Sequence, residues 1–436
     1  MEKELTARSA CLQILNRFSE DKSVHFKVAE PLESREKAKV REYVQGIFRR
    51  LSYIDFLISQ YSSVKLDEMK VSLHNLLRLA TYDLLFMDST PDYAAINEAV
   101  ELSKITISHK TGDLVNAILR NMQRDIDDLP RPNYKDRTKL VAATFSHPEW
   151  LVKRWSKKLG EREAFKLMQS NNKRPHFYVR ANNLRTKTDN FKLRMTKHNI
   201  EFEESPWLPG YFKVDSVQPF IQKEWVQKGF CQIQDVAAGL APTILDPQSG
   251  ENVYDLCAAP GTKTIMIADK MNCEGSVLAV DRDTNRLEKL AESALCYQAD
   301  IIKIRRGDVL DLRLPLADAV LLDAPCTGTG VLSKRADLRW RRTPEDLENI
   351  IEEQAELLDA AGNMVSRGGR LVYSTCSLEP EENMEQVKSF LKTYDNFELQ
   401  DLSDYIHEDL LIENNMAYQT YPHKHGCDGH FGVLMK

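Results

Sequence analysis

The chain has 436 residues, of which 42% are hydrophobic and 28% charged, and its 59 Lys and Arg against 65 Asp and Glu give a net charge of −6. This composition excludes disordered and fibrous proteins, and the length allows two or three domains. No apolar stretch approaches the roughly 18 residues of a membrane span, and the first residues lack the apolar core of a secretion signal. We therefore expect a cytoplasmic protein with no membrane partner. The net acidity argues against coating nucleic acid through bulk charge but leaves room for a local basic patch.

Residues 1–142 are predicted to form an all-helical bundle. Apolar side chains recur at the spacing i, i+3, i+4 and i+7 over 73–84 and again over 115–122, as in helices with one buried face. Pro91 indicates the start of a further helix near Tyr93. This part shows no convincing alternation of the kind that strands require.

Residues 143–229 are predicted to form a small α+β module. The apolar positions over 148–168 predict a helix, and the alternation at 177–179 predicts a strand after Pro175. The module is rich in Lys and Arg, which suits contact with a polyanion such as RNA.

Residues 230–436 are predicted to form an α/β, Rossmann-like domain with a mainly parallel, doubly wound sheet. Short apolar runs alternate there with helical stretches such as 285–297 and 344–364. Ligands on such sheets bind outside the carboxyl ends of the strands. The runs that we predict to be strands are 253–256, 277–280, 301–304, 319–322 and 370–373.

Acidic and small residues follow the first three predicted strands. The run from Asp255 to Lys263 is a small-residue loop that lets a ligand approach the backbone, and it is neither a GxGxxG motif nor a P-loop. Asp281 and Asp308 follow the next two strands. One such acid alone is more simply a helix cap, but acids at successive strand ends favour a site for a nucleoside-bearing cofactor.

Two of the eight cysteines follow the last two predicted strands. Cys326 stands three residues after Asp323, and Cys376 stands in a loop of Ser and Thr. A lone loop cysteine is usually structural, but a pair in small-residue loops at one ligand-binding edge favours chemistry. No pair has CxxC spacing, so we expect neither a disulfide framework nor a zinc ribbon.

Taken together, the motifs Asp255–Lys263, Asp323–Cys326 and Ser374–Ser377 resemble the NOL1/NOP2/Sun family of RNA 5-methylcytosine methyltransferases. The resemblance covers nearly the whole chain and is greatest to the bacterial-type branch that acts on 16S, small-subunit rRNA. The helical part is similar to the NusB RNA-binding fold through residues 91–104 and 116–120.

The resemblance implies S-adenosylmethionine as the methyl donor and a covalent adduct between a cysteine and carbon 6 of cytosine. It makes Cys376 the nucleophile and Cys326 the residue that helps to release the adduct, an order that physics alone leaves open. Asp323 is assigned to the cytosine edge, as a protonated carboxyl near N3, or to the cofactor. The residues assigned to the cofactor are Cys257, Ala258, Ala259, Pro260, Gly261, Thr262, Lys263, Asp281, Asp308 and Asp323.

A basic segment directly follows the Cys326 loop and is predicted to bind RNA phosphates, with one aromatic ring available to stack. A solvated surface helix is an equally simple interpretation of this charge run. The residues are Lys334, Arg335, Arg339, Trp340, Arg341 and Arg342.

The C-terminal His423, His425, Cys427 and His430 fit no structural zinc spacing, so we expect no metal. The family usually has a threonine-like residue at Cys427 and an aromatic residue at His430, so this chain departs from the family pattern at both positions. We expect a monomer acting on small-subunit rRNA. The alternatives are the same chemistry on tRNA or another rRNA site, and a NusB-like RNA-binding or ribosome assembly factor without activity. The strand-end acids and both cysteines argue against the last.

Overall fold

The computed structural model describes residues 5–24, 26–88 and 90–436. The chain divides into two compact units. The first, which we call the helical unit, consists of Met1–Arg174 and Leu332–Thr343, and the second, which we call the sheet unit, consists of Pro175–Val331 and Pro344–Lys436. A short basic segment, Leu332–Thr343, therefore belongs to the helical unit, although the sequence on both sides of it belongs to the sheet unit.

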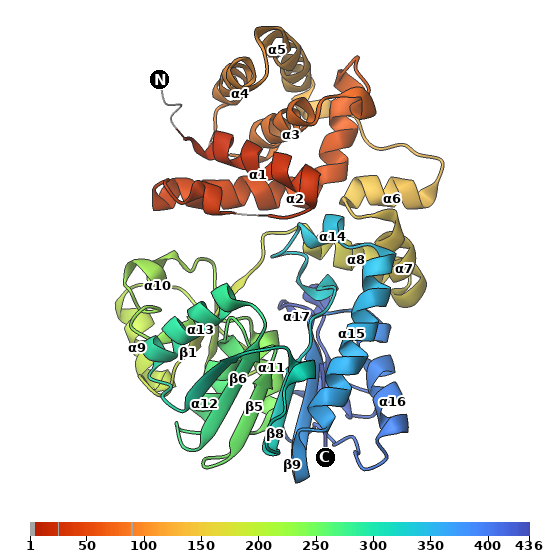
Figure 1. Cartoon of the computed structure of the whole chain (residues 1–436). Coiled ribbons are helices and arrows are strands. Elements are labelled where there is room, and N and C mark those ends of the chain that lie inside the picture. The colour runs from red at the N-terminus through yellow and green to blue at the C-terminus, as the bar shows by residue number, and fades with distance from the viewer. Residues whose placement is uncertain (1–4, 25, 89) are drawn as a thin grey trace. The chain divides into compact units, whose positions relative to one another are not determined.

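The helical unit confirms the predicted bundle. The apolar residues of 73–84 and 115–122 lie on the buried faces of two of its helices, and the helix predicted near Tyr93 begins at Asp92. Thr6 and Ser9 form a capping box at the start of the first helix. The helices are α1 (Ala7–Asp21), α2 (Ser34–Tyr61), α3 (Val71–Phe86), α4 (Asp92–Thr106), α5 (His109–Arg124), α6 (Arg137–Phe145), α7 (Glu149–Leu159), α8 (Glu161–Asn171) and α14 (Leu338–Arg341) (Figure 1).

The helix predicted over 148–168 is two helices, α7 and α8. Gly160 separates them, with a φ of +78° that favours glycine. Both helices belong to the helical unit, not to the strands that follow them. The predicted domain boundary at residue 142 falls inside α6.

The strands of the middle region form a small antiparallel sheet in the order β2-β3-β1-β4. Its core contains Phe191, Phe212, Phe220 and Trp225. The last strand lies just beyond residue 229, so the predicted boundary there cuts this sheet. The elements are β1 (Phe177–Ala181), α9 (Thr188–Lys197), β2 (Glu203–Glu204), β3 (Tyr211–Val214), α10 (Gln218–Gln222) and β4 (Cys231–Ile233).

The large sheet confirms the predicted Rossmann-like architecture. Its order is β10-β11-β12-β9-β8-β5-β6-β7; the five predicted strands pair in parallel, and the last three strands of the chain add an antiparallel edge. The strands are β5 (Asn252–Leu256), β6 (Ser276–Asp281), β7 (Ile302–Arg306), β8 (Ala317–Asp323), β9 (Val365–Thr375), β10 (Leu411–Ile412), β11 (Ala417–Gln419) and β12 (Phe431–Met435).

Helices cover both faces of this sheet. Helices α11 and α12 pack on one face, and α15 packs against β8 and β9 on the other, with α16 beside it (Figure 1). The chain passes outward from β5 to β7 and then returns to β8 on the other side of β5, which places a topological switch point between β5 and β8. The helices are α11 (Val236–Leu245), α12 (Thr262–Lys270), α13 (Thr284–Tyr297), α15 (Pro344–Gly362), α16 (Met384–Thr393) and α17 (Pro422–His425).

Short 3-10 helices complete the connections. Two of them flank the site described below, η5 (Thr329–Val331) and η6 (Pro380–Glu382). The others are η1 (Phe26–Ala29), η2 (Leu66–Glu68), η3 (Ile126–Asp128), η4 (Val309–Asp311) and η7 (Glu408–Leu410). Within the described ranges, no helix has the length and apolarity that crossing a membrane requires.

Candidate active site

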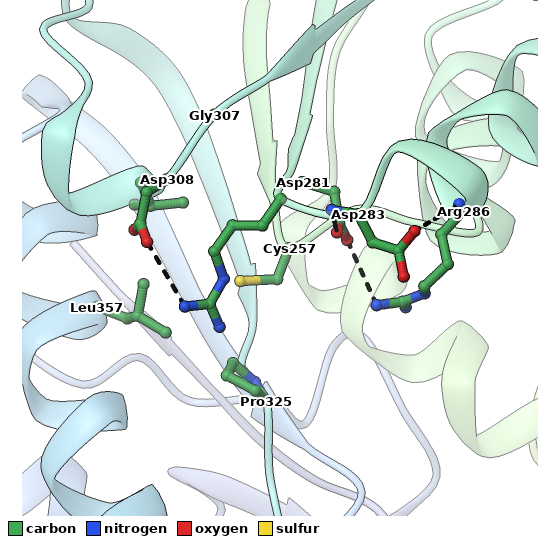
Figure 2. Close-up of a pocket in the computed structure, with 10 residues that line it drawn as sticks. Cys257, Asp281, Asp283, Arg286, Gly307, Asp308, Pro325 and Leu357 are labelled. Atoms are coloured by element: carbon green, nitrogen blue, oxygen red, sulfur yellow. Dashed lines mark hydrogen bonds and ion pairs between the residues drawn. The ribbon is translucent and has the colours of Figure 1, made fainter. Parts of the chain in front are cut away.

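A pocket of about 210 Å³ lies at the carboxyl ends of β5, β6 and β7 (Figure 2). It brings together three residues that the sequence pattern assigned to a cofactor, Cys257, Asp281 and Asp308. Two arginines from the start of α13 and the turn before it, which the sequence pattern did not single out, also line it. The lining residues are Cys257, Asp281, Arg282, Asp283, Arg286, Gly307, Asp308, Val309, Pro325 and Leu357.

Backbone donors and an arginine fix the carboxylate of Asp281. It is buried and accepts hydrogen bonds from the main-chain N–H groups of Ala259, at 3.0 Å, and Asp283, at 2.9 Å. The guanidinium of Arg286 lies 3.6 Å from it and also donates to the carbonyl of Ala259. Asp281 therefore ties the loop after β5 to the end of β6 while its carboxylate still lines the pocket.

The loop after β5 turns sharply into α12. Gly261 has a φ of +100°, and a Cβ atom there would lie 2.6 Å from Cγ of Leu290, so the turn requires glycine. Ala258 and Ala259 are buried, whereas Pro260 is exposed and does not line the pocket. Lys263, in the first turn of α12, points to a different group of residues.

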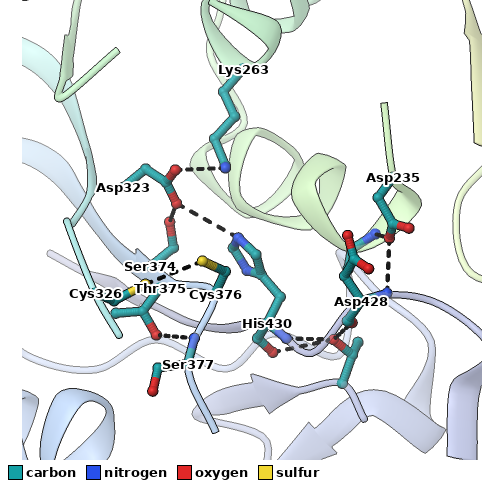
Figure 3. Close-up of polar contacts among 12 residues, drawn as sticks. Asp235, Lys263, Asp323, Cys326, Ser374, Thr375, Cys376, Ser377, Asp428 and His430 are labelled. Carbon is teal, nitrogen blue, oxygen red and sulfur yellow. Dashed lines mark hydrogen bonds and ion pairs between the residues drawn. The ribbon is translucent and has the colours of Figure 1, made fainter. Parts of the chain in front are cut away.

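That second group surrounds Asp323 at the end of β8 (Figure 3). Lys263 Nζ lies 2.7 Å from Asp323 Oδ2, and Ser374 Oγ donates to Oδ1 at 2.9 Å. Burial would raise the pKa of Asp323, but the Lys263 ammonium and His430 outweigh it and hold that pKa below its usual range. The carboxyl is therefore ionised, and the expectation of a protonated carboxyl at this position does not fit the structure.

The two cysteines predicted to carry chemistry lie side by side. Their Sγ atoms are 3.2 Å apart, at the ends of the adjacent parallel strands β8 and β9. The hydrogen bond to Cys376, burial and nearby negative charges raise the pKa of Cys326 well above its ordinary value. Cys326 therefore holds its proton and can donate it to Cys376. Burial would lower the pKa of Lys263, but Asp323 and a negative charge at Cys376 raise it.

A buried glutamate, Glu382 in η6, fixes the Cys326 loop and was not singled out in the sequence. Its carboxylate accepts from the main-chain N–H of Thr327 at 2.7 Å and from the hydroxyls of Thr327 and Ser377. Gln354 of α15 donates both to this carboxylate, at 3.2 Å, and to the carbonyl of Pro325, at 2.9 Å. These bonds connect the residues that flank Cys326 and Cys376, so the two thiols are held in one rigid framework.

In the basic segment after the Cys326 loop, the prediction that Arg339 binds RNA is wrong. The guanidinium of Arg339 is fully buried and donates to the carbonyls of Ser146, at 2.9 Å, and Asn171, at 3.2 Å. The indole N–H of Trp340 donates to the carbonyl of Phe48 at 2.7 Å. The Arg339 guanidinium is therefore not available to a phosphate. The Trp340 ring stays half-buried and lines a pocket of the helical unit, so its contact with RNA stays a prediction.

The other basic residues of the segment keep exposed or half-exposed surface. Arg335 and Arg341 form ion pairs with the buried Asp337, each at 3.4 Å. For these two residues, and for Lys334 and Arg342, RNA binding stays a prediction.

The C-terminal histidines do not gather into a metal site. Among the residues that the structure describes, no group of three or more His, Cys, Asp or Glu side chains is arranged to hold a metal ion. His430, which precedes β12, instead faces Asp323, and its Nε2 lies 3.6 Å from Asp323 Oδ1 (Figure 3). In the sequence this residue was conspicuous only as a departure from the family pattern.

Three family models match successive parts of the chain. Residues 5–124 match the NusB family, and residues 147–220 match the ferredoxin-like domain of RsmF/B-like methyltransferases. Residues 242–436 match the family described as 16S rRNA methyltransferase RsmB/F. These matches confirm the resemblance that the motifs predicted.

Similar proteins cover nearly the same length. The chain is 31% identical over 411 residues to ribosomal RNA small subunit methyltransferase B of Escherichia coli O1:K1 / APEC, which is 92% of this chain and 93% of that protein. It is 33% identical over 373 residues to the probable ribosomal RNA small subunit methyltransferase B of Synechocystis sp., covering 84% and 83% of the two chains. A solved structure of a methyltransferase homolog protein from Pyrococcus horikoshii is 28% identical, with a TM-score of 0.59, over 68% of this chain and 97% of that one.

Proposed function

Because the chain belongs to the RsmB/F family of 16S rRNA methyltransferases, we propose that it methylates carbon 5 of a cytosine in small-subunit rRNA, with S-adenosylmethionine as the methyl donor. The observation that carries this proposal is the pair of thiols, 3.2 Å apart, beside the ion-paired Asp323. Carbon 5 of cytosine is a poor nucleophile. Addition of a thiolate at carbon 6 makes it reactive enough to attack an electrophilic methyl group, and this addition must later be reversed.

The pocket at the ends of β5, β6 and β7 suits the donor molecule. The carboxylates of Asp281 and Asp308 line it, and both can accept hydrogen bonds from the hydroxyl or amino groups of a nucleoside. When bound, S-adenosylmethionine supplies a methyl group made electrophilic by its sulfonium. Pro325, the residue before Cys326, lines the same pocket, so the donor site and the thiols adjoin.

Electrostatics support Cys376 as the nucleophile. A thiol must lose its proton to attack, and this is favoured by a nearby cation and by a hydrogen bond to the sulfur. Lys263 interacts favourably with a negative charge on Cys376, and the Cys326 thiol, which holds its proton, can donate to Cys376 Sγ. Cys326 is thus the thiol that keeps its proton, which leaves Cys376 as the nucleophile in this proposal.

The same electrostatics support Cys326 as the base that helps to release the RNA from its adduct with Cys376. The largest cause of its raised pKa is the hydrogen bond to Cys376, whose sulfur becomes neutral once it is bonded to carbon 6. Formation of the bond to carbon 6 removes the largest cause of the raised pKa of Cys326, which favours transfer of its proton to solvent. The resulting thiolate then takes the proton from carbon 5, the bond between carbon 6 and Cys376 breaks, and Cys376 leaves as a thiolate.

Asp323 suits the amino edge of the cytosine. Because its carboxylate is ionised, it can accept a hydrogen bond from the exocyclic N4 amino group, and it is held in place by Lys263 and Ser374. The target base must leave its stack to reach this half-buried carboxylate, which is easiest in single-stranded or loop RNA.

Two cysteine variants test the roles of the thiols. We expect Cys326→Ala to accumulate a covalent protein–RNA adduct, which denaturing electrophoresis detects, and Cys376→Ala to form neither adduct nor methylated RNA. Cys296→Ala, a half-buried cysteine of α13 outside the pocket lining, serves as the control and should behave as the parent protein. Methylation by Cys376→Ala would show that the nucleophile is a different residue.

The RNA is identified by bisulfite mapping of rRNA and tRNA from cells with and without the gene. Loss of one cytosine modification in small-subunit rRNA supports the proposal. Loss of a tRNA site instead would keep the chemistry and change the substrate. Loss of no site would favour an RNA-binding assembly factor without methyltransferase activity.

A further inference from the structure

His430 is a buried imidazole with a hydrogen-bond partner at only one ring nitrogen. Its side chain is almost fully enclosed, and Nδ1 lies 2.9 Å from the hydroxyl of Tyr418. No residue that the structure describes makes a hydrogen bond to Nε2. Asp323 Oδ1 lies 3.6 Å from Nε2, which is longer than a hydrogen bond (Figure 3). A buried polar atom without a hydrogen bond is costly, so the position of Nε2 beside Asp323, the carboxylate that we assign to the cytosine, points to a ligand.

The surroundings decide which nitrogen of His430 carries the proton. Burial lowers the pKa of His430, although Asp323 opposes this, so the ring is neutral and has one N–H. Burial also raises the pKa of Tyr418 well above its ordinary value, so that side chain keeps its hydroxyl proton. Tyr418 can donate to Nδ1, which leaves the proton on Nε2. In the other tautomer, the Nε2 lone pair would face the negatively charged carboxylate of Asp323, and the two would repel each other.

Other charged groups around the ring are consistent with this assignment. Lys263 lowers the pKa of His430 and keeps the ring neutral, while Asp235 acts in the opposite direction. The main-chain N–H of His430 donates to Thr420 Oγ1 at 2.8 Å, and this bond holds the main chain that carries the ring. The site therefore presents a fixed N–H donor on His430 beside a fixed carboxylate acceptor on Asp323.

We propose that Asp323 and His430 together recognise the Watson–Crick edge of the target cytosine, with Asp323 accepting from the N4 amino group and His430 Nε2–H donating to N3. This rests on the proposed function and names the residue that sets its base specificity. Cytosine offers a donor at N4 beside an acceptor at N3, the complement of this pair. Uracil offers an acceptor at position 4 beside N3–H, which would place acceptor against acceptor and donor against donor.

The same contact assists the reaction. When the Cys376 thiolate bonds to carbon 6, the π electrons of the C5–C6 bond move toward C4, and negative charge collects on N3. A fixed N–H donor at N3 is stronger in that state than in the starting complex, so it lowers the barrier to addition. The proton stays on Nε2 throughout, and His430 acts by hydrogen bonding alone.

The test compares kcat/KM for two enzymes, each on two RNAs, in the manner of a double-mutant cycle. The RNAs carry cytosine or 3-deazacytosine, in which a C–H replaces N3, at the site found by bisulfite mapping, and the enzymes are the parent protein and His430→Phe. We expect His430→Phe to lower kcat/KM on cytosine RNA about tenfold, the loss of one buried hydrogen bond. The penalty for 3-deazacytosine should be about tenfold smaller in His430→Phe than in the parent. The intrinsic effect of the altered ring is common to both enzymes and cancels.

Two further variants guard against misfolding. His430→Gln keeps an N–H donor and should recover part of the lost kcat/KM, and Tyr418→Phe keeps the imidazole but removes the hydroxyl that sets its tautomer. We expect Tyr418→Phe to reduce the preference for cytosine over uracil RNA while leaving the melting temperature near that of the parent. Equal 3-deazacytosine penalties in the parent and in His430→Phe would overturn the assignment of His430. A parent protein that does not methylate the cytosine RNA at all would instead overturn the proposed function.

Discussion

Replacing Arg339 with methionine separates a structural role from an RNA-binding role. The guanidinium is enclosed by oxygen atoms of the helical unit and has no carboxylate partner among its hydrogen bonds. Its shortest bonds go to the Ser146 carbonyl at 2.9 Å and Asn172 Oδ1 at 2.8 Å. Arg339→Met keeps much of the side-chain volume but removes every one of these donors.

The expected loss follows from these contacts. A hydrogen bond from a charged donor contributes roughly 1.5–3 kcal/mol, so the two short bonds together give about 3–6 kcal/mol. Burial of the charge offsets part of this, because it lowers the pKa of Arg339 to about 9. We therefore expect Arg339→Met to lower the free energy of unfolding of the helical unit by about 3 kcal/mol.

Urea unfolding followed by circular dichroism measures this loss, and filter binding measures RNA affinity as salt is varied. Arg335→Met is the matched control, because Arg335 is exposed and its ion pair with Asp337 should contribute less than about 1 kcal/mol. The reasoning is refuted if Arg339→Met unfolds at the same urea concentration as Arg335→Met but binds RNA more weakly than the parent protein does, with a flatter salt dependence. That result would restore Arg339 to the RNA-binding surface.

Two further predictions concern titration. Lys263→Met removes the ammonium that holds down the pKa of Asp323, so burial will raise that pKa, and we expect the acidic limb of the pH–rate profile to move to higher pH. An unmoved limb would show that Asp323 does not act as a carboxylate in the reaction. Burial and Arg339 hold the pKa of His147 well below 6.5, so the unfolded chain takes up a proton there before the native one does. Stability should fall as pH drops below about 6.5, by up to about 1.4 kcal/mol per pH unit, and melting curves of His147→Gln should show a smaller decline.

Local patterns were sufficient to predict the helices at 73–84 and 115–122 and the five parallel strands, and to place the two thiols after two of those strands. The helical repeat over 73–84 and the apolar runs of the large sheet are properties of neighbouring residues, and so they survive folding. In a parallel sheet the carboxyl ends of the strands meet at one edge, so residues that follow separate strands come together. Cys326 and Cys376, fifty residues apart, are brought to 3.2 Å by this rule.

Residues whose roles depend on distant partners could not be predicted. A basic residue in a charged segment looks the same in the sequence whether its side chain is exposed to solvent or buried against main-chain carbonyls. Arg339 is buried, and its carbonyl partners, Ser146 and Asn171, are distant in the sequence. Glu382 is one acid among several in its segment, and only the fold brings it to Thr327. The neighbours of His430 in the sequence do not indicate the proposed role of this residue, because that role depends on contacts with Asp323 and Tyr418.

In the mechanism that we propose, the charges of the site give the two neighbouring thiols different roles. Negative charges on two sulfur atoms 3.2 Å apart would repel each other, so only one of the two thiols ionises at a time. With Cys376 as the thiolate, Cys326 must stay protonated, and its raised pKa reflects this. Once Cys376 is covalently bound, its negative charge is gone and the second thiol can ionise. In the proposed mechanism, the separation of 3.2 Å makes the two ionisations sequential, in the order that attack followed by release requires.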